Sequence, residues 1–137
     1  MDVKRLIVII GFIHLTACAV QPVNNSAELN NFRNYALGSC LGAAFSGTVA
    51  ASDLNKAVNG YMEFGNMPLE AYEELRALNK VWLAKDYSSK HGGQINSMKC
   101  FDLYNSEQVL ALYKKYDPCE SKETWMDSSS FEKACSN

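Results

Sequence analysis

Few residues in this chain have a type and a spacing that could support catalysis. His91 precedes Cys100 in one polar stretch, and the two could be imagined as a general base and a thiol nucleophile. Cys100 has a simpler explanation, because it is one of five cysteines in a chain with an export signal, and exported cysteines are joined in disulfides. We therefore do not expect this pair to be catalytic.

Other motifs of catalysis and cofactor binding are missing from the sequence. The chain has no Walker loop, no G-x-S-x-G and no C-x-x-C. Once the export signal is removed His91 is the only histidine, which excludes a histidine-rich zinc site. The adjacent acids Glu73 and Glu74 point in different directions on a helix and cannot act as a hydrolase pair. The sequence predicts no enzyme activity, no cofactor and no metal, and so favours a binding role.

The length of the chain bounds its number of domains, and its charge bears on the kind of partner it can bind. A chain of 137 residues, 47% of them apolar, can form one domain with a core plus a short extra segment. The formal net charge is −2, and there is no basic run beyond Lys114-Lys115. A nucleic-acid partner is therefore not expected.

The polar stretch that begins at Tyr87 is the best candidate for a binding site. Its first half contains paired serines and paired glycines, which form turns and leave little to bury. Its second half is expected to be a short helix that turns Met98, Phe101 and residues 103–104 inward, with Cys100 held by a disulfide. A glycine-hinged loop on a braced helix can present itself to a partner, and we assign this role to Ser88, Ser89, Lys90, His91, Gly92 and Gly93.

Four further segments show apolar residues every three or four positions, which predicts helices. The first begins at Ala27, the second at Ser52, and the third has Pro68 in its first turn. The fourth is capped by Ser106, and a last turn is expected over residues 131–135. Residues expected to face the core in the second and third helices include Leu54, Ala57, Val58, Leu69 and Tyr72. The predicted fold is all-α: a small single-domain helical bundle of about five to six helices, braced by disulfides.

Four cysteines remain once an export signal is cleaved, and an even number in an exported chain implies disulfides with three possible connectivities. We predict that Cys40 pairs with Cys100, which would fix the first helix to the base of the loop, and that Cys119 pairs with Cys135.

Segments spread over most of the chain also carry a family resemblance. They are Phe32–Leu41, Gly60–Met62, Tyr87–Lys90 and Met98–Tyr104. In order and spacing they resemble the periplasmic immunity proteins of type VI secretion amidase effectors, the family-four group. The similarity runs from about Asn31 to Tyr116.

The resemblance implies an inhibitor with a protein partner. Such a protein would neutralise a cognate amidase toxin that cuts the peptide stems of peptidoglycan with a Cys-His active site in a cleft. The loop from Ser88 to Gly93 would fill that cleft, and a homodimer would let one assembly block two toxins. The alternative is a lipid-anchored envelope structural or assembly protein without a toxin partner.

The N-terminal residues predict export and divide the chain into three parts. Lys4-Arg5 precedes the apolar run Leu6–Leu15, which is too short to span a membrane stably. Leu15-Thr16-Ala17-Cys18 then fits a lipobox, although the overlapping Ala17-Cys18-Ala19 also fits an ordinary A-x-A cleavage site. We therefore expect a lipoprotein signal peptide over residues 1–17, a tether over 18–26 and a helical immunity domain over 27–137.

Cys18 is expected to be lipidated and to hold the protein on the periplasmic side of the outer membrane, because Ala19 is not an acidic inner-membrane retention signal. Replacing Cys18 by serine should move the protein from the membrane fraction to the soluble periplasm, measured by fractionation and immunoblotting. A wild-type protein that is already soluble, with Val20 as its first residue, would instead support ordinary signal cleavage.

Overall fold

The structure, a computed structural model, describes residues 27–120, 127–129 and 135. These residues form α1 (Ala27–Ala44), α2 (Val49–Phe64), α3 (Leu69–Leu83), α4 (Asn96–Tyr104) and α5 (Glu107–Tyr116), with no β-strand among them. The predicted all-α, disulfide-braced fold is confirmed. The expected signal peptide, the tether with Cys18 and most of the expected last turn lie outside the described residues.

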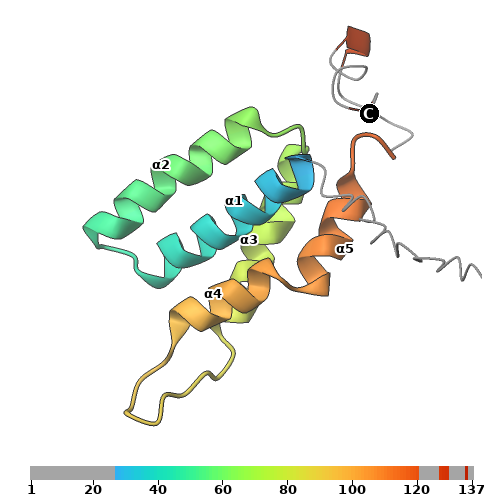
Figure 1. Cartoon of the computed structure of the whole chain (residues 1–137). Helices are drawn as coiled ribbons and strands as arrows, with labels where there is room; N and C mark the ends of the chain where they lie inside the picture. The colour runs from blue at the N-terminus through green and yellow to red at the C-terminus, as the bar shows by residue number, and fades with distance from the viewer. Residues whose placement is uncertain (1–26, 121–126, 130–134, 136–137) are drawn as a thin grey trace, which may run out of the picture.

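Helix α1 is the element on which the others assemble, since it packs against α2, α3, α4 and α5 (Figure 1). Its buried side chains recur at helical spacing: Leu29, Phe32, Tyr35, Ala36 and Cys40. Helix α2 lies alongside α1 as the second member of a helical hairpin and leaves its outer face open. None of the helices in the described part of the chain is both long and apolar enough to cross a membrane.

Aromatic rings fill the space between α1, α3 and α5. The ring centroids of Tyr35 and Tyr72 are 4.6 Å apart, and Phe32 lies 5.8 Å from Tyr72 and 6.3 Å from Tyr113. The Tyr35 hydroxyl remains satisfied at the edge of this cluster, because Arg76 donates a hydrogen bond of 2.7 Å to it. These contacts bury large apolar surfaces from three helices in one core.

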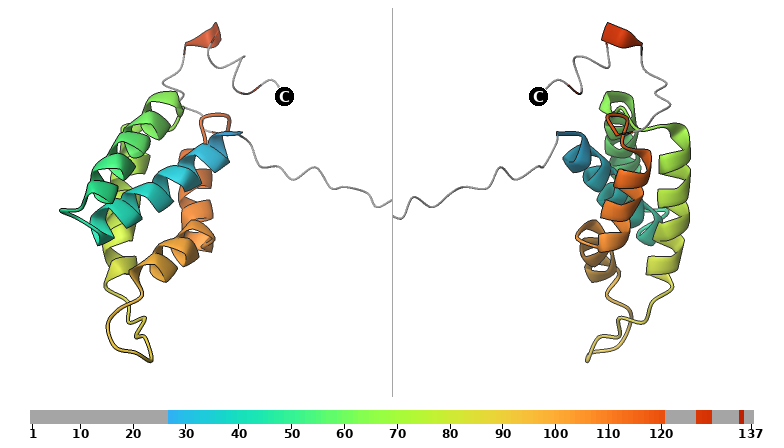
Figure 2. Two further views of the ribbon diagram at one scale, coloured as in Figure 1. Left: turned by 60° about the vertical axis from the view of Figure 1, so that its left-hand side comes forward. Right: turned by 90° about the vertical axis from the view of Figure 1, so that its right-hand side faces the viewer.

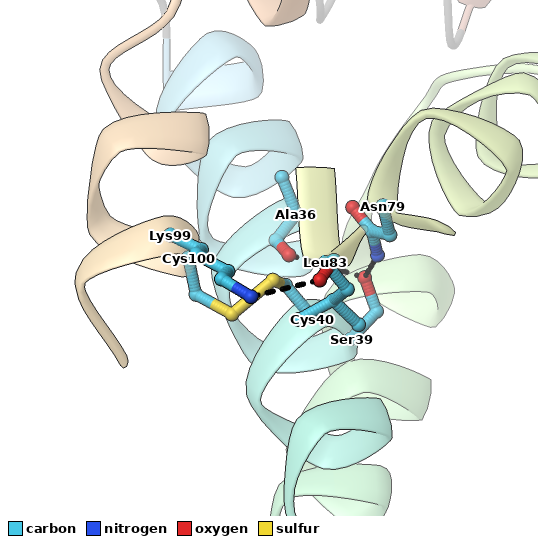
Figure 3. Close-up of a disulfide and its surroundings, with 7 residues drawn as sticks. All are labelled: Ala36, Ser39, Cys40, Asn79, Leu83, Lys99 and Cys100. Atoms are coloured by element: carbon cyan, nitrogen blue, oxygen red, sulfur yellow. Dashed lines mark hydrogen bonds between the residues drawn. A yellow bond between two sulfur atoms is a disulfide. The ribbon is translucent and has the colours of Figure 1, made fainter. Parts of the chain in front are cut away.

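The two disulfides pair the cysteines as predicted. Cys40 on α1 is bonded to Cys100 on α4, with a Cα–Cα distance of 5.5 Å, and both residues are fully buried (Figure 3). Cys119, which is exposed, is bonded to Cys135 in the C-terminal tail. The first bridge therefore lies inside the core, whereas the second joins the exposed Cys119 to the half-buried Cys135.

Two expectations about α2 and α3 were wrong. Helix α2 begins at Val49 rather than Ser52, because the Thr48 side chain accepts a hydrogen bond from the Ala51 N–H (3.1 Å) and caps the helix there. Ala57 and Leu69, expected in the core, are exposed, Leu69 by 57%.

The inward face of α4 also differs from the expected one. Met98 and Phe101 are 48% and 53% exposed, while Lys99 and Leu103 are buried. The disulfide explains this difference, because it turns Cys100 towards α1. Helical geometry then places Lys99 and Leu103 on the packed side, and Met98 and Phe101 on the opposite side.

Replacing Cys40 and Cys100 together by alanine is expected to lower the free energy of unfolding by about 4 kcal/mol, since the bridge closes a loop of 60 residues. Equilibrium urea unfolding measures this loss. The matched control replaces Cys119 and Cys135, which are 16 residues apart, and the chain-entropy relation gives at most about 3 kcal/mol there. A larger loss in the control than in the core variant would contradict the account.

Candidate partner-binding loop

The candidate site is the loop of residues 84–95 that joins α3 to α4. In all three views it extends past the ends of the helices and away from the bundle (Figures 1 and 2). All six residues assigned to partner binding from the sequence lie in this loop, and all except the half-buried Ser89 are exposed. The structure therefore places them together at one end of the molecule.

The tip of the loop is a tight hairpin rather than an irregular connection. The Ser89 N–H donates to the Gly93 carbonyl oxygen (2.9 Å), and the Gly92 N–H donates to the Ser89 carbonyl oxygen (3.0 Å). The Ser89 hydroxyl also accepts from the His91 N–H at 3.1 Å. Gly92 and Gly93 have φ values of +90° and +78°, a region that other residues rarely adopt. Both glycines are thus required by the turn, and Lys90 and His91 form its exposed apex.

Side chains in the two stems of the hairpin tie it together below the tip. Gln94 donates to a carboxylate oxygen of Asp86 (2.7 Å) and accepts from the Tyr87 N–H (2.9 Å), and the Ser88 hydroxyl donates to the same Asp86 oxygen (2.5 Å). These hydrogen bonds from Gln94 and Ser88 hold the pKa of the Asp86 carboxyl below its ordinary value. The stem network is therefore present above the ordinary pKa of an aspartate and is lost only as the pH falls through the lowered value.

Tyr87 connects the loop to α4. Its hydroxyl donates to Asp102 at 2.8 Å, which raises the pKa of the Tyr87 phenol, and its carbonyl oxygen accepts from the Ile95 N–H at 2.9 Å. The hairpin is consequently anchored to the helix that follows it as well as to itself.

Sequence reasoning missed the residues that hold the loop in shape. Asp86, Gln94 and Asp102 carry no local signal, because their roles depend on how the two stems meet. Lys99 did carry one: Ile95, Lys99 and Leu103 are four residues apart, which predicts one helical face. The lysine is 2% exposed and donates from Nζ to the Leu83 carbonyl oxygen at 2.9 Å.

The arrangement is suited to binding. Cys100 is buried in a disulfide, so it offers no thiol to His91. In the described residues, no group of three or more His, Cys, Asp and Glu side chains is placed to hold a metal ion. What the loop does offer is a hydrogen-bonded apex that exposes an ammonium and an imidazole.

Comparison with known proteins finds a matching family and similar solved structures. Residues 30–113 match the Tai4 family, described as type VI secretion system (T6SS) amidase immunity protein. A structure of the effector–immunity system Tae4/Tai4 from Salmonella typhimurium aligns with a TM-score of 0.60 and 25% identity, over 64% of this chain and 87% of that one. A structure from work on new type VI-secreted toxins and self-resistance proteins in Serratia marcescens aligns with a TM-score of 0.60 and 18% identity, over 72% of this chain and 81% of that one. At this low identity it supports the fold alone. No curated protein matches the sequence.

Replacing Gly92 by alanine should strain the hairpin by about 1–2 kcal/mol, because an L-residue is disfavoured at its φ of +90°. Amide hydrogen exchange at Ser89 and Gly92, whose N–H groups close the turn, should become several-fold faster. Gly60→Ala is the control, since it lies in α2 with open space around its Cβ position and should stabilise the protein slightly. Unchanged exchange at both hairpin amides would mean that the turn does not depend on Gly92.

Proposed function

Because the chain belongs to the family of type VI secretion system amidase immunity proteins, we propose that it binds and inhibits a cognate peptidoglycan amidase effector by inserting the loop of residues 88–93 into the amidase's Cys-His active-site cleft. It acts as an inhibitor in the periplasm. The observation that carries the proposal is the family match over residues 30–113, which contains this loop.

The shape of the loop supports the insertion mechanism. A narrow hairpin that extends past the helices can enter a cleft, and no heavy atom beyond the adjoining residues lies within 4 Å of the Cβ positions of Gly92 and Gly93. The backbone of the apex can therefore approach the cleft wall closely. Lys90 and His91 are the two side chains at the apex long enough to reach polar groups deep in a cleft.

The fixed conformation of the loop favours high affinity for a partner. Three hydrogen bonds in the hairpin tip and the stem network around Asp86 fix the conformation before any partner arrives. A segment that is already ordered loses less conformational entropy on binding than a flexible one. The loop thus has the exposure of a binding segment and the rigidity of an inhibitor.

The position of the loop is compatible with a membrane tether. Helix α1 begins at Ala27 at the end of the bundle opposite the loop (Figures 1 and 2). If Cys18 is lipidated and residues 18–26 form the tether, the loop would be directed away from the membrane, towards the peptidoglycan where the amidase acts. A homodimer, as the resemblance implies, would carry two such loops.

Lys90→Ala combined with His91→Ala should weaken binding of the cognate amidase by about 2 kcal/mol or more, the range of an interface hot spot. Gly92→Val should have a similar effect through backbone strain and bulk. The measurement is isothermal titration calorimetry with the cognate amidase.

The controls separate binding from folding. Lys56→Ala removes an exposed lysine from α2, far from the loop in sequence, and should leave the affinity unchanged. Melting temperatures should hardly differ among these variants, since none of the substituted residues is in the core and the strain at Gly92 is confined to the exposed hairpin. Equal affinities for the wild type, the double variant and Gly92→Val would exclude the loop as the inhibitory element.

A further inference from the structure

Lys99 occupies an unusual place for a lysine. It lies in the first half of α4, next to Cys100, and only 2% of its surface is exposed. Its Nζ donates to the backbone carbonyl oxygen of Leu83, the last residue of α3, at 2.9 Å (Figure 3). The contact joins the two helices at the points where the loop leaves one and enters the other.

Removing an ammonium group from water is unfavourable unless it gains strong partners. The end of α3 provides a suitable one, because the last carbonyl groups of a helix lack partners within the helix and carry partial negative charge. Ala84 and Lys85 donate their N–H groups to the carbonyl oxygens of Lys80 and Trp82, and Lys99 donates to that of Leu83. Its positive charge is thus aligned with the α3 dipole.

The stems of the hairpin begin at this contact. On the α3 side, Asp86 lies three residues beyond Leu83 and carries the hydrogen bonds from Ser88 and Gln94. Lys99 also acts electrostatically on Asp86 and favours its charged form. On the α4 side, the disulfide fixes Cys100 to α1. Helix α4 is therefore held to α1 by a covalent bond and to α3 by the lysine.

We propose that Lys99 is a positioning residue for the inhibitory loop: its buried ammonium holds the end of α3 and the start of α4 at the spacing that the hairpin needs. This inference rests on the proposed function of the loop. It assigns the lysine a role in partner recognition although the side chain is too buried to touch a partner. A lysine that only stabilised the core would leave the hairpin unchanged when replaced.

The first test needs no partner. Lys99→Met keeps the aliphatic stem and removes the ammonium, Lys99→Arg keeps a charged donor, and Lys80→Met removes an exposed lysine near the same end of α3. Amide hydrogen exchange is followed at Ser89, Gly92 and Ile95, whose N–H groups close the hairpin. We expect exchange at least tenfold faster in Lys99→Met, a partial return in Lys99→Arg and no change in Lys80→Met. Unchanged exchange in a folded Lys99→Met would overturn the proposal.

A second variant covers the case in which Lys99→Met does not fold. Asp86→Ala changes an exposed residue and removes the stem carboxylate that accepts hydrogen bonds from Ser88 and Gln94. The same three amides should then exchange faster while the melting temperature stays within a few degrees of the wild type. No change at these amides would show that the stem on the α3 side does not order the hairpin. Holding the end of α3 could then not position the loop, and the proposal would be overturned.

The second test uses the cognate amidase. Lys99→Met should weaken binding about tenfold, mainly through slower association, and this effect should vanish when Lys90 and His91 are already alanine. Faster loop exchange without weaker binding, although the Lys90 and His91 double variant does weaken it, would overturn the positioning role alone. If the double variant itself binds normally, the proposed function of the loop fails, whatever the exchange data show.

Discussion

The disulfide between Cys40 and Cys100 is the constraint on which the loop-bearing end of the molecule depends. Helix α1 contributes the main core residues, and the bond attaches to it a short helix of nine residues that could not otherwise be expected to hold its orientation. That orientation buries Lys99 and Leu103 and exposes Met98 and Phe101. It also decides where the loop of residues 84–95 returns to the bundle.

A single chain of contacts therefore leads from the core to the exposed apex. The aromatic cluster joins α1 to α3, the disulfide joins α1 to α4, and Lys99 joins α4 back to α3. The hairpin extends from α3 and α4, which these contacts hold in place, and its own hydrogen bonds keep Lys90 and His91 at the tip. Because each contact is short and specific, the loop can be exposed to solvent and still be ordered.

Much of this could be predicted from the sequence, for identifiable reasons. Helical spacing revealed the helices, Ser106 is the cap of α5 as expected, and paired serines and glycines indicated the loop. The start of α2 was missed because Thr48 and Ser52 are both capping residues, and only the observed hydrogen bond separates them. The face of α4 depends on the direction in which the disulfide pulls Cys100, and the stem network depends on the meeting of Asp86 with Gln94. The contact between the two stems leaves no local pattern, whereas the four-residue spacing of Ile95, Lys99 and Leu103 did indicate the packed face of α4.

The most direct test of the inhibitory role is to locate the apex of the loop in the complex. A photo-activatable cross-linking amino acid is placed at position 91, and at position 64 on the exposed face of α2 as a control, and adducts with the cognate amidase are mapped by mass spectrometry. The account predicts that position 91 cross-links to peptides that line the active-site cleft and that position 64 does not. Adducts from position 64 alone, or adducts from position 91 confined to the amidase surface far from the cleft, would contradict it.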